Sequence, residues 1–225
     1  ILPNMLTLIG VCIGLSSIRF ALDGKFEFAI IAIILAAIID GLDGRIARLI
    51  KGTSKVGKEL DSLTDVISFG VAPAFIMYFW SLNTLGRVGW LICLAYVVCV
   101  ALRLARFNVN SEDEPSWKDN FFEGIPSPAG GILILMPLIF ELTNLDIGVD
   151  IKKFTPYFTI IIAILLVSKI PTPALKKISI SPKATVFLLL GIGVVFIALL
   201  FYRFETLLVF GLVYLFTIPI SIIIY

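Results

Sequence analysis

The chain contains no histidine, and only three of its 225 residues are cysteine. Without histidine, the protein cannot use a Ser-His-Asp triad, a histidine general base or a histidine-ligated metal. Cys12, Cys93 and Cys99 all lie in apolar stretches, and an odd, buried set argues against a disulfide framework. Any proton chemistry must therefore use carboxylates, lysine, tyrosine, cysteine or water.

Charged residues are also scarce, at 15% of the chain, whereas hydrophobic residues make up 59%. Soluble domains carry roughly 25% charged residues, so this composition is too apolar for a soluble protein. The net charge of +2 does not suggest a nucleic-acid partner, and we expect none. The composition predicts that the protein's environment is a lipid bilayer.

The apolar residues are grouped in eight blocks, each a candidate membrane helix. A span needs ~20 mostly apolar residues, and these blocks lack the alternating pattern of barrel strands. The sequence therefore predicts an all-α, polytopic transmembrane helix bundle of about eight helices, although the sixth block is short for a span. The blocks cover residues 6–22, 27–50, 60–80, 87–107, 129–144, 155–169, 184–201 and 204–224.

The loop charges predict the orientation of this bundle. Every second loop, beginning with 45–58, carries twelve lysines and arginines in total, and the remaining loops carry six. Because basic residues accumulate in cytoplasmic loops, we expect loop 45–58 and both termini to lie in the cytoplasm. No linker is long enough to separate domains, so residues 1–225 are expected to form a single integral membrane domain.

Two pairs of aspartates flank the first cytoplasmic loop. Asp40 and Asp43 end the second block three residues apart, and Asp61 and Asp65 begin the third block four residues apart. Each pair therefore lies on one helix face. If the two faces meet, four carboxylates converge and repel one another unless cations neutralise them. Mg²⁺ prefers oxygen ligands, and paired divalent cations serve displacement at phosphorus.

Small residues and one arginine accompany these carboxylates. Gly44, Ala47 and Arg48 continue the first acidic face, and Gly57 begins the second. Small side chains give a bulky anion access to the backbone, and an arginine donates to phosphate oxygens. Solvated acids or close helix packing would explain any one of these residues alone. Their combination on two neighbouring helices favours a site for a phosphorylated ligand.

Residues 40–65 read D-x2-D-G-x2-A-R-x8-G-x3-D-x3-D, which resembles the signature of the CDP-alcohol phosphatidyltransferases. These membrane enzymes move a phosphatidyl group from a CDP-linked lipid to an alcohol and release CMP. The resemblance implies a six-helix core over residues 1–169, with two additional helices in 170–225. It also implies a homodimer of the cell membrane. Because loop 45–58 is expected in the cytoplasm, the active site would face the cytoplasm.

The resemblance also implies a role for each motif residue. Two divalent cations, Mg²⁺ or Mn²⁺, would be the cofactors, and Asp65 would double as general base. The implied metal ligands are Asp40, Asp43, Asp61 and Asp65. The implied contacts to the CDP-lipid are Asn4, Thr7, Gly44, Ala47, Arg48 and Gly57. The first two come from the segment PNMLT, which is also a good helix start without any ligand.

A second polar region resembles the phosphatidylserine synthase branch of this family. ALRLARFNVN ends the fourth block, and FFEGIPSPAGG enters the fifth. This resemblance implies transfer from CDP-diacylglycerol to the hydroxyl of L-serine, with phosphatidylserine and CMP as products. The lack of histidine and glutamine and the abundance of isoleucine and lysine are typical of thermophiles and archaea, which leaves the ether lipid CDP-archaeol open as the donor. A serine pocket needs a cation for the carboxylate and acceptors for the ammonium group. The candidate serine contacts are Arg103, Arg106, Asn108, Glu123 and Ser127.

Three alternatives remain open. Another member of the family would use a glycerol-phosphate or inositol-phosphate acceptor. A UbiA-like prenyltransferase also pairs aspartates with Mg²⁺, but its acidic motifs are spaced differently and lack the Gly-x2-Ala-Arg element. An ion transporter could also hold carboxylates within the membrane. A panel of acceptors tests the first alternative, and stabilisation by CDP with a divalent cation tests the last.

Overall fold

The computed structural model describes residues 2–49, 55–110, 121–143, 145, 148, 150–173 and 182–224. Within these ranges nearly all of the chain is helical, and the two strands have three residues each. The prediction of an all-α bundle is therefore confirmed. Each of the eight predicted blocks coincides with helical structure, although the third and the fifth are subdivided.

The first two helices form a hairpin. α1 (Leu2–Leu22) and α2 (Phe26–Leu49) are joined by a tight turn at Gly24, whose φ of +71° favours glycine. The other elements are α3 (Lys55–Asp65), η1 (Val66–Val71), α4 (Ala72–Trp80), η2 (Leu82–Leu85), α5 (Arg87–Asn110), β1 (Phe121–Glu123), α6 (Ser127–Leu133), α7 (Met136–Leu142), α8 (Ile151–Val167), β2 (Pro171–Pro173), α9 (Pro182–Phe201) and α10 (Arg203–Ile224).

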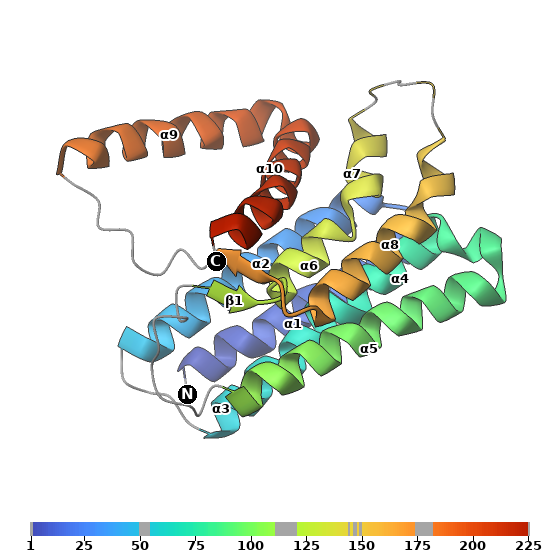
Figure 1. Cartoon of the computed structure of the whole chain (residues 1–225), viewed down its shortest axis with the longest axis horizontal. Coiled ribbons are helices and arrows are strands. Elements are labelled where there is room, and N and C mark those ends of the chain that lie inside the picture. Colours follow the sequence, from blue (N-terminus) through green and yellow to red (C-terminus); the bar gives the residue numbers. More distant parts are fainter. Residues whose placement is uncertain are drawn as a thin grey trace.

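α1, α2, α5 and α8 run in a common direction, so this part of the bundle has two ends (Figure 1). The N-terminus, the end of α2 and the start of α3 lie together at the lower left. α7 and the start of α8 lie at the opposite end. α9 extends away from the bundle and packs with α10 (Figure 1). The two aspartate pairs are therefore carried to the same end of the bundle.

Four helical stretches are long and apolar enough to cross a membrane by length and composition: Asn4–Leu22, Val56–Trp80, Arg87–Val109 and Arg203–Ile222. α2 carries acidic residues at its end, and α8 has only 17 residues. Within the described residues these four stretches are the candidate spans, and they indicate an integral membrane protein.

The third predicted block contains a π-helical turn. α3, η1 and α4 follow one another without a break, and the N–H of Ala72 donates to the carbonyl of Ile67, five residues earlier. The buried Tyr96 of α5 donates its hydroxyl to the carbonyl of Phe69 at 2.9 Å. Such turns are rare and frequently lie at functional sites. This one begins directly after Asp65.

The fifth predicted block is not a single helix, which corrects the expectation for 129–144. α6 and α7 are separated by a turn at residues 134–135. Pro137 explains the break, because it has no N–H to donate to the carbonyl four residues earlier. The result is two helices of seven residues each.

A short ladder fixes the chain just before α6. β1 and β2 pair antiparallel, with Phe122 opposite Thr172. Gly124, at φ +74°, donates its N–H to Ile170 at 2.9 Å and accepts a hydrogen bond from the Thr172 hydroxyl at 2.8 Å. This ladder ties the segment entering α6 to the segment leaving α8, and thereby positions Ser127.

Two glycines allow neighbouring helices to pack closely against η1. A Cβ added to Gly14 of α1 would lie 2.5 Å from Ser68 Oγ. A Cβ added to Gly131 of α6 would lie 3.0 Å from the Cα of Phe69. Both distances are shorter than ordinary van der Waals contact, so η1 is held between these two glycine surfaces.

We expect Gly131→Ala to destabilise the protein by about 1–3 kcal/mol, because the added methyl group overpacks the contact with the Phe69 backbone. Thermal unfolding of the detergent-solubilised protein measures this effect. Gly193→Ala is the matched control, because a Cβ at Gly193 meets nothing within 4 Å. Equal melting temperatures for the two variants would contradict the packing assigned to η1.

Candidate metal centre

Three aspartates from two helices meet at one end of the bundle. One carboxylate oxygen from each of Asp40, Asp43 and Asp61 lies within 4.8 Å of the others. Asp40 and Asp43 belong to α2 and Asp61 to α3, so the cluster exists only where these helices meet. A set of negatively charged oxygen ligands suits a hard divalent cation such as Mg²⁺.

Asp65 extends this cluster by one helical turn. Its side chain interacts with those of Asp40 and Asp61, and lies within hydrogen-bonding reach of Asp40. Asp65 is only 9% exposed, and among the described residues its Oδ1 has no hydrogen-bond partner. Because buried polar atoms are almost always paired, this oxygen is available to a proton or a cation. The structure thus brings all four predicted aspartates together.

Thr7 orients one of these carboxylates. Its hydroxyl donates to Asp43 Oδ2 at 2.8 Å, and both side chains are buried. Asn4 lies almost one turn earlier on α1 and is half-buried. Hydrogen bonds from neighbouring groups fix the rotamer of a ligand and leave its other oxygen directed at the metal. The geometry of Thr7 therefore suits a partner of the cluster, whereas the sequence resemblance implied a contact to CDP.

The small residues beside the cluster leave open space at one position. A Cβ added to Gly44 would meet no atom of the described residues within 4 Å, so the described structure leaves open space at this position. Gly57 is half-buried on α3. Ala47 and Arg48 belong to α2, but their side chains lie outside the described part of the structure.

Arg103 of α5 brings a positive charge to the aspartates. It is 8% exposed and interacts electrostatically with Asp65 and Asp40. Its Nη1 donates to the hydroxyl of Ser127, at the start of α6. Its Nε has no hydrogen-bond partner in the described part of the chain. Two predicted serine contacts, Arg103 and Ser127, are therefore joined beside the cluster.

Arg106 and Asn108 have hydrogen-bond partners outside the cluster, and the side chain of Glu123 is not described. Arg106 donates to the carbonyl of Val167 at 2.7 Å, so it holds the last turn of α8. Asn108 donates to the hydroxyl of Ser62 at 2.8 Å, so it joins α5 to α3. The backbone of Glu123 belongs to β1, whereas its side chain lies outside the described part. Arg103 and Arg106 thus have different partners despite their spacing of three residues.

Tyr214 is a site neighbour that the sequence did not reveal. It lies on α10 and interacts electrostatically with Arg103. The chain has six tyrosines, and Tyr214 sits within an apolar block without any motif. Nothing in the local pattern separates it from an ordinary core residue.

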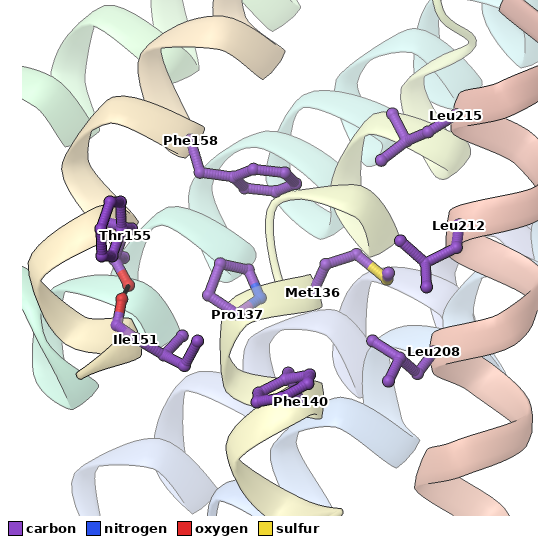
Figure 2. Close-up of a pocket in the computed structure, with 10 residues that line it drawn as sticks. Met136, Pro137, Phe140, Ile151, Thr155, Phe158, Leu208, Leu212 and Leu215 are labelled. Carbon is purple, nitrogen blue, oxygen red and sulfur yellow. Dashed lines mark hydrogen bonds between the residues drawn. The ribbon is translucent and has the colours of Figure 1, made fainter. Parts of the chain in front are cut away.

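A separate cleft lies between α7, α8 and α10, away from the acidic end of α2 (Figures 1 and 2). The volume of this cleft is about 200 Å³. The side chain of Thr155 donates to the carbonyl of Ile151 at 3.1 Å, so its hydroxyl is already paired. The lining residues are Met136, Pro137, Phe140, Ile151, Phe154, Thr155, Phe158, Leu208, Leu212 and Leu215. This cleft has no charged group to bind a metal or a phosphate.

These features define a polytopic helical membrane protein with a carboxylate centre suited to divalent cations at one end of the bundle. The chain belongs to the CDP-alcohol phosphatidyltransferase family, whose model matches residues 1–222. The resemblance of residues 40–65 is therefore confirmed as family membership.

Three relatives carry the name CDP-diacylglycerol–serine O-phosphatidyltransferase. The protein of Mycobacterium leprae is 42% identical over 187 residues, which cover 81% of this chain and 61% of the relative. The protein of Helicobacter pylori strain 26695 is 35% identical over 195 residues, which cover 87% of this chain and 81% of the relative. The protein of Bacillus subtilis is 34% identical over 177 residues, which cover 78% of this chain and 92% of the relative. The chain spans less than two thirds of the mycobacterial relatives.

We expect Thr7→Val to lower the affinity for Mn²⁺ by about ten- to a hundredfold, because Asp43 loses its orienting hydrogen bond. Titration of the detergent-solubilised protein, with free Mn²⁺ followed by electron paramagnetic resonance, measures the affinity. Thr143→Val is the matched control, because its hydroxyl caps α7 and bonds to Phe140. An unchanged affinity in Thr7→Val would show that Asp43 does not depend on this contact.

Proposed function

We propose that the protein catalyses metal-dependent transfer of the phosphatidyl group from CDP-diacylglycerol to the hydroxyl of L-serine, forming phosphatidylserine and releasing CMP. The observation that carries the proposal is the approach of three carboxylates within 4.8 Å beside the buried Asp65. Family membership and the names of the relatives support it. CDP-archaeol, an ether lipid with the same headgroup, is the alternative donor. Membership also argues against the prenyltransferase and transporter alternatives.

We infer that two divalent cations, Mg²⁺ or Mn²⁺, are held by the four aspartates. The residues fit this cofactor, because they provide only oxygen ligands and because Thr7 already orients Asp43. Bound there, the cations would neutralise the pyrophosphate and stabilise charge on the departing CMP. The proposed contacts to the CDP group are Asn4, Thr7, Gly44, Ala47, Arg48 and Gly57. The open space at Gly44 supports this assignment.

Asp65 is the proposed general base. Its unpaired Oδ1 accepts the proton of the serine hydroxyl, and the serine oxygen then attacks the lipid-side phosphorus. The bond from that phosphorus to the CMP oxygen breaks, and the electron pair leaves with CMP. The proposed reaction is a single displacement without an enzyme-bound intermediate, in which the serine oxygen attacks the lipid-side phosphorus directly.

The acceptor pocket is proposed beside Arg103. This guanidinium lies in electrostatic range of Asp65, and one serine molecule has its carboxylate and its hydroxyl only a few bonds apart. Arg103 would bind the carboxylate while Asp65 receives the hydroxyl proton. A glycerol-phosphate or inositol-phosphate acceptor brings a more highly charged group, for which one buried arginine is a weaker match. Arg106, Asn108, Glu123 and Ser127 remain proposed members of this pocket.

We further propose a homodimer in the cell membrane, with the active site and both termini facing the cytoplasm. The excess of basic residues in the loops at the aspartate end supports this orientation. The N-terminus lies at that same end (Figure 1). Residues 1–169 would form the catalytic core of a single membrane domain, followed by two additional helices in 170–225.

We expect Asp65→Asn to lower kcat by about 10²–10⁴-fold, because the isosteric amide cannot accept the serine proton. Incorporation of radiolabelled serine into lipid, with Mg²⁺ and CDP-diacylglycerol, measures the rate. Thermal stabilisation by CDP and Mg²⁺ should weaken but persist in this variant, because Asp40, Asp43 and Asp61 still provide carboxylate ligands. The wild type should lose all activity in chelator and recover it with added metal. Wild-type CMP release that does not depend on serine would contradict the proposed acceptor.

We expect Arg103→Lys to raise the KM for serine while the KM for CDP-diacylglycerol changes little, because lysine cannot reproduce the forked contact with a carboxylate. Arg106→Lys is the matched comparison, since its guanidinium bonds to the Val167 carbonyl. Steady-state kinetics with each substrate varied in turn measures both constants. An equal rise of both KM values in Arg103→Lys would indicate that Arg103 binds phosphate instead.

A further inference from the structure

Three buried side-chain atoms have no hydrogen-bond partner in the described part of the chain: Asp65 Oδ1, Arg103 Nε and Tyr214 Oη. They come from α3, α5 and α10, which are far apart in the sequence. Arg103 interacts electrostatically with both of the other residues, so the three atoms share one neighbourhood. Because buried polar atoms are nearly always paired, three unpaired atoms in one neighbourhood point to a polar ligand that would pair with them.

The hydroxyl of Tyr214 has no well-formed hydrogen bond within the residues that the structure describes. Thr172 is the neighbour that interacts with it, and Thr172 donates its own proton to the carbonyl of Gly124 at 2.8 Å. Arg103 directs Nη1 to Ser127. The phenolic proton of Tyr214 is therefore available to a ligand that offers a stronger acceptor than the threonine hydroxyl.

α10 is firmly seated, so the position of Tyr214 is fixed. A Cβ added to Gly211 would lie 2.2 Å from the sulfur of Met136, and the helix also packs against β2. Gly211 and Tyr214 are three residues apart and therefore share one helix face. That face is directed at the bundle and not at lipid.

We propose that Tyr214 is a positioning residue for the acceptor, donating its hydroxyl to the same carboxylate that Arg103 Nε binds. This inference rests on the proposed transfer to serine. Two donors from different helices match the two oxygens of a carboxylate, and Asp65 Oδ1 takes the proton of the hydroxyl. Tyr214 is neutral and Arg103 carries one positive charge, so together they suit a ligand group with one negative charge, such as a carboxylate. α10, which follows the predicted core of residues 1–169, thereby selects an amino-acid acceptor.

The test is Tyr214→Phe, which removes only the hydroxyl. Kinetics are measured with L-serine and with L-serinamide, in which an uncharged amide replaces the carboxylate. We expect the KM for serine to rise roughly ten- to a hundredfold, as for the loss of one hydrogen bond to a charged group. The KM for CDP-diacylglycerol should stay constant, and the kcat/KM preference for serine over serinamide should fall by a similar factor. The control is Tyr202→Phe, an exposed tyrosine directly before α10, which should change none of these values.

The outcomes separate the two proposals. If the wild type releases no CMP with serine, the proposed function fails and this inference fails with it. If the wild type is active and Tyr214→Phe retains the serine KM and the preference over serinamide, only this inference is overturned. A parallel rise of both KM values also overturns it, because that pattern indicates a structural role. The double variant Tyr214→Phe/Arg103→Lys should raise the KM for serine by less than the product of the two single-variant increases, because both residues hold the same carboxylate.

Discussion

The close approach of carboxylates at the ends of two membrane helices is the constraint on which the structure depends. Like charges repel, and the repulsion grows where packed protein and lipid exclude water. The chain places compensating groups around the cluster: the Thr7 hydroxyl on Asp43, and the Arg103 guanidinium in range of Asp40 and Asp65. A bound divalent cation would provide the remaining compensation. The same arrangement of carboxylates therefore favours the binding of cations.

The surrounding fold keeps these groups in place through close backbone contacts. Gly14 and Gly131 let α1 and α6 press on η1, which begins directly after Asp65. The β1–β2 ladder holds the segment before α6, and Ser127 in turn holds Arg103. Asp65 and Arg103 are thus held by separate supports. Small displacements of either group would change the distance across which the proposed acceptor would have to fit.

Polar and apolar sites occupy different parts of the molecule. The aspartates lie at the end of α2, whereas the cleft of α7, α8 and α10 is lined by side chains suited to lipid (Figures 1 and 2). α10 contributes to both regions, with Leu208 and Leu212 in the cleft and Tyr214 near Arg103. The last helix is therefore integrated into the bundle, although its sequence carries no motif.

The sequence alone determined the eight helical blocks and the acidic faces of α2 and α3, because hydrophobic length and spacings of three or four residues are local properties. It could not reveal the partners of Arg103 and Arg106, nor the role of Thr7 beside Asp43. Those contacts join residues 24 to 61 positions apart. Tyr214 reaches Arg103 from a different helix altogether. Only tertiary packing decides such pairs, because no local periodicity encodes which distant helix a side chain will meet.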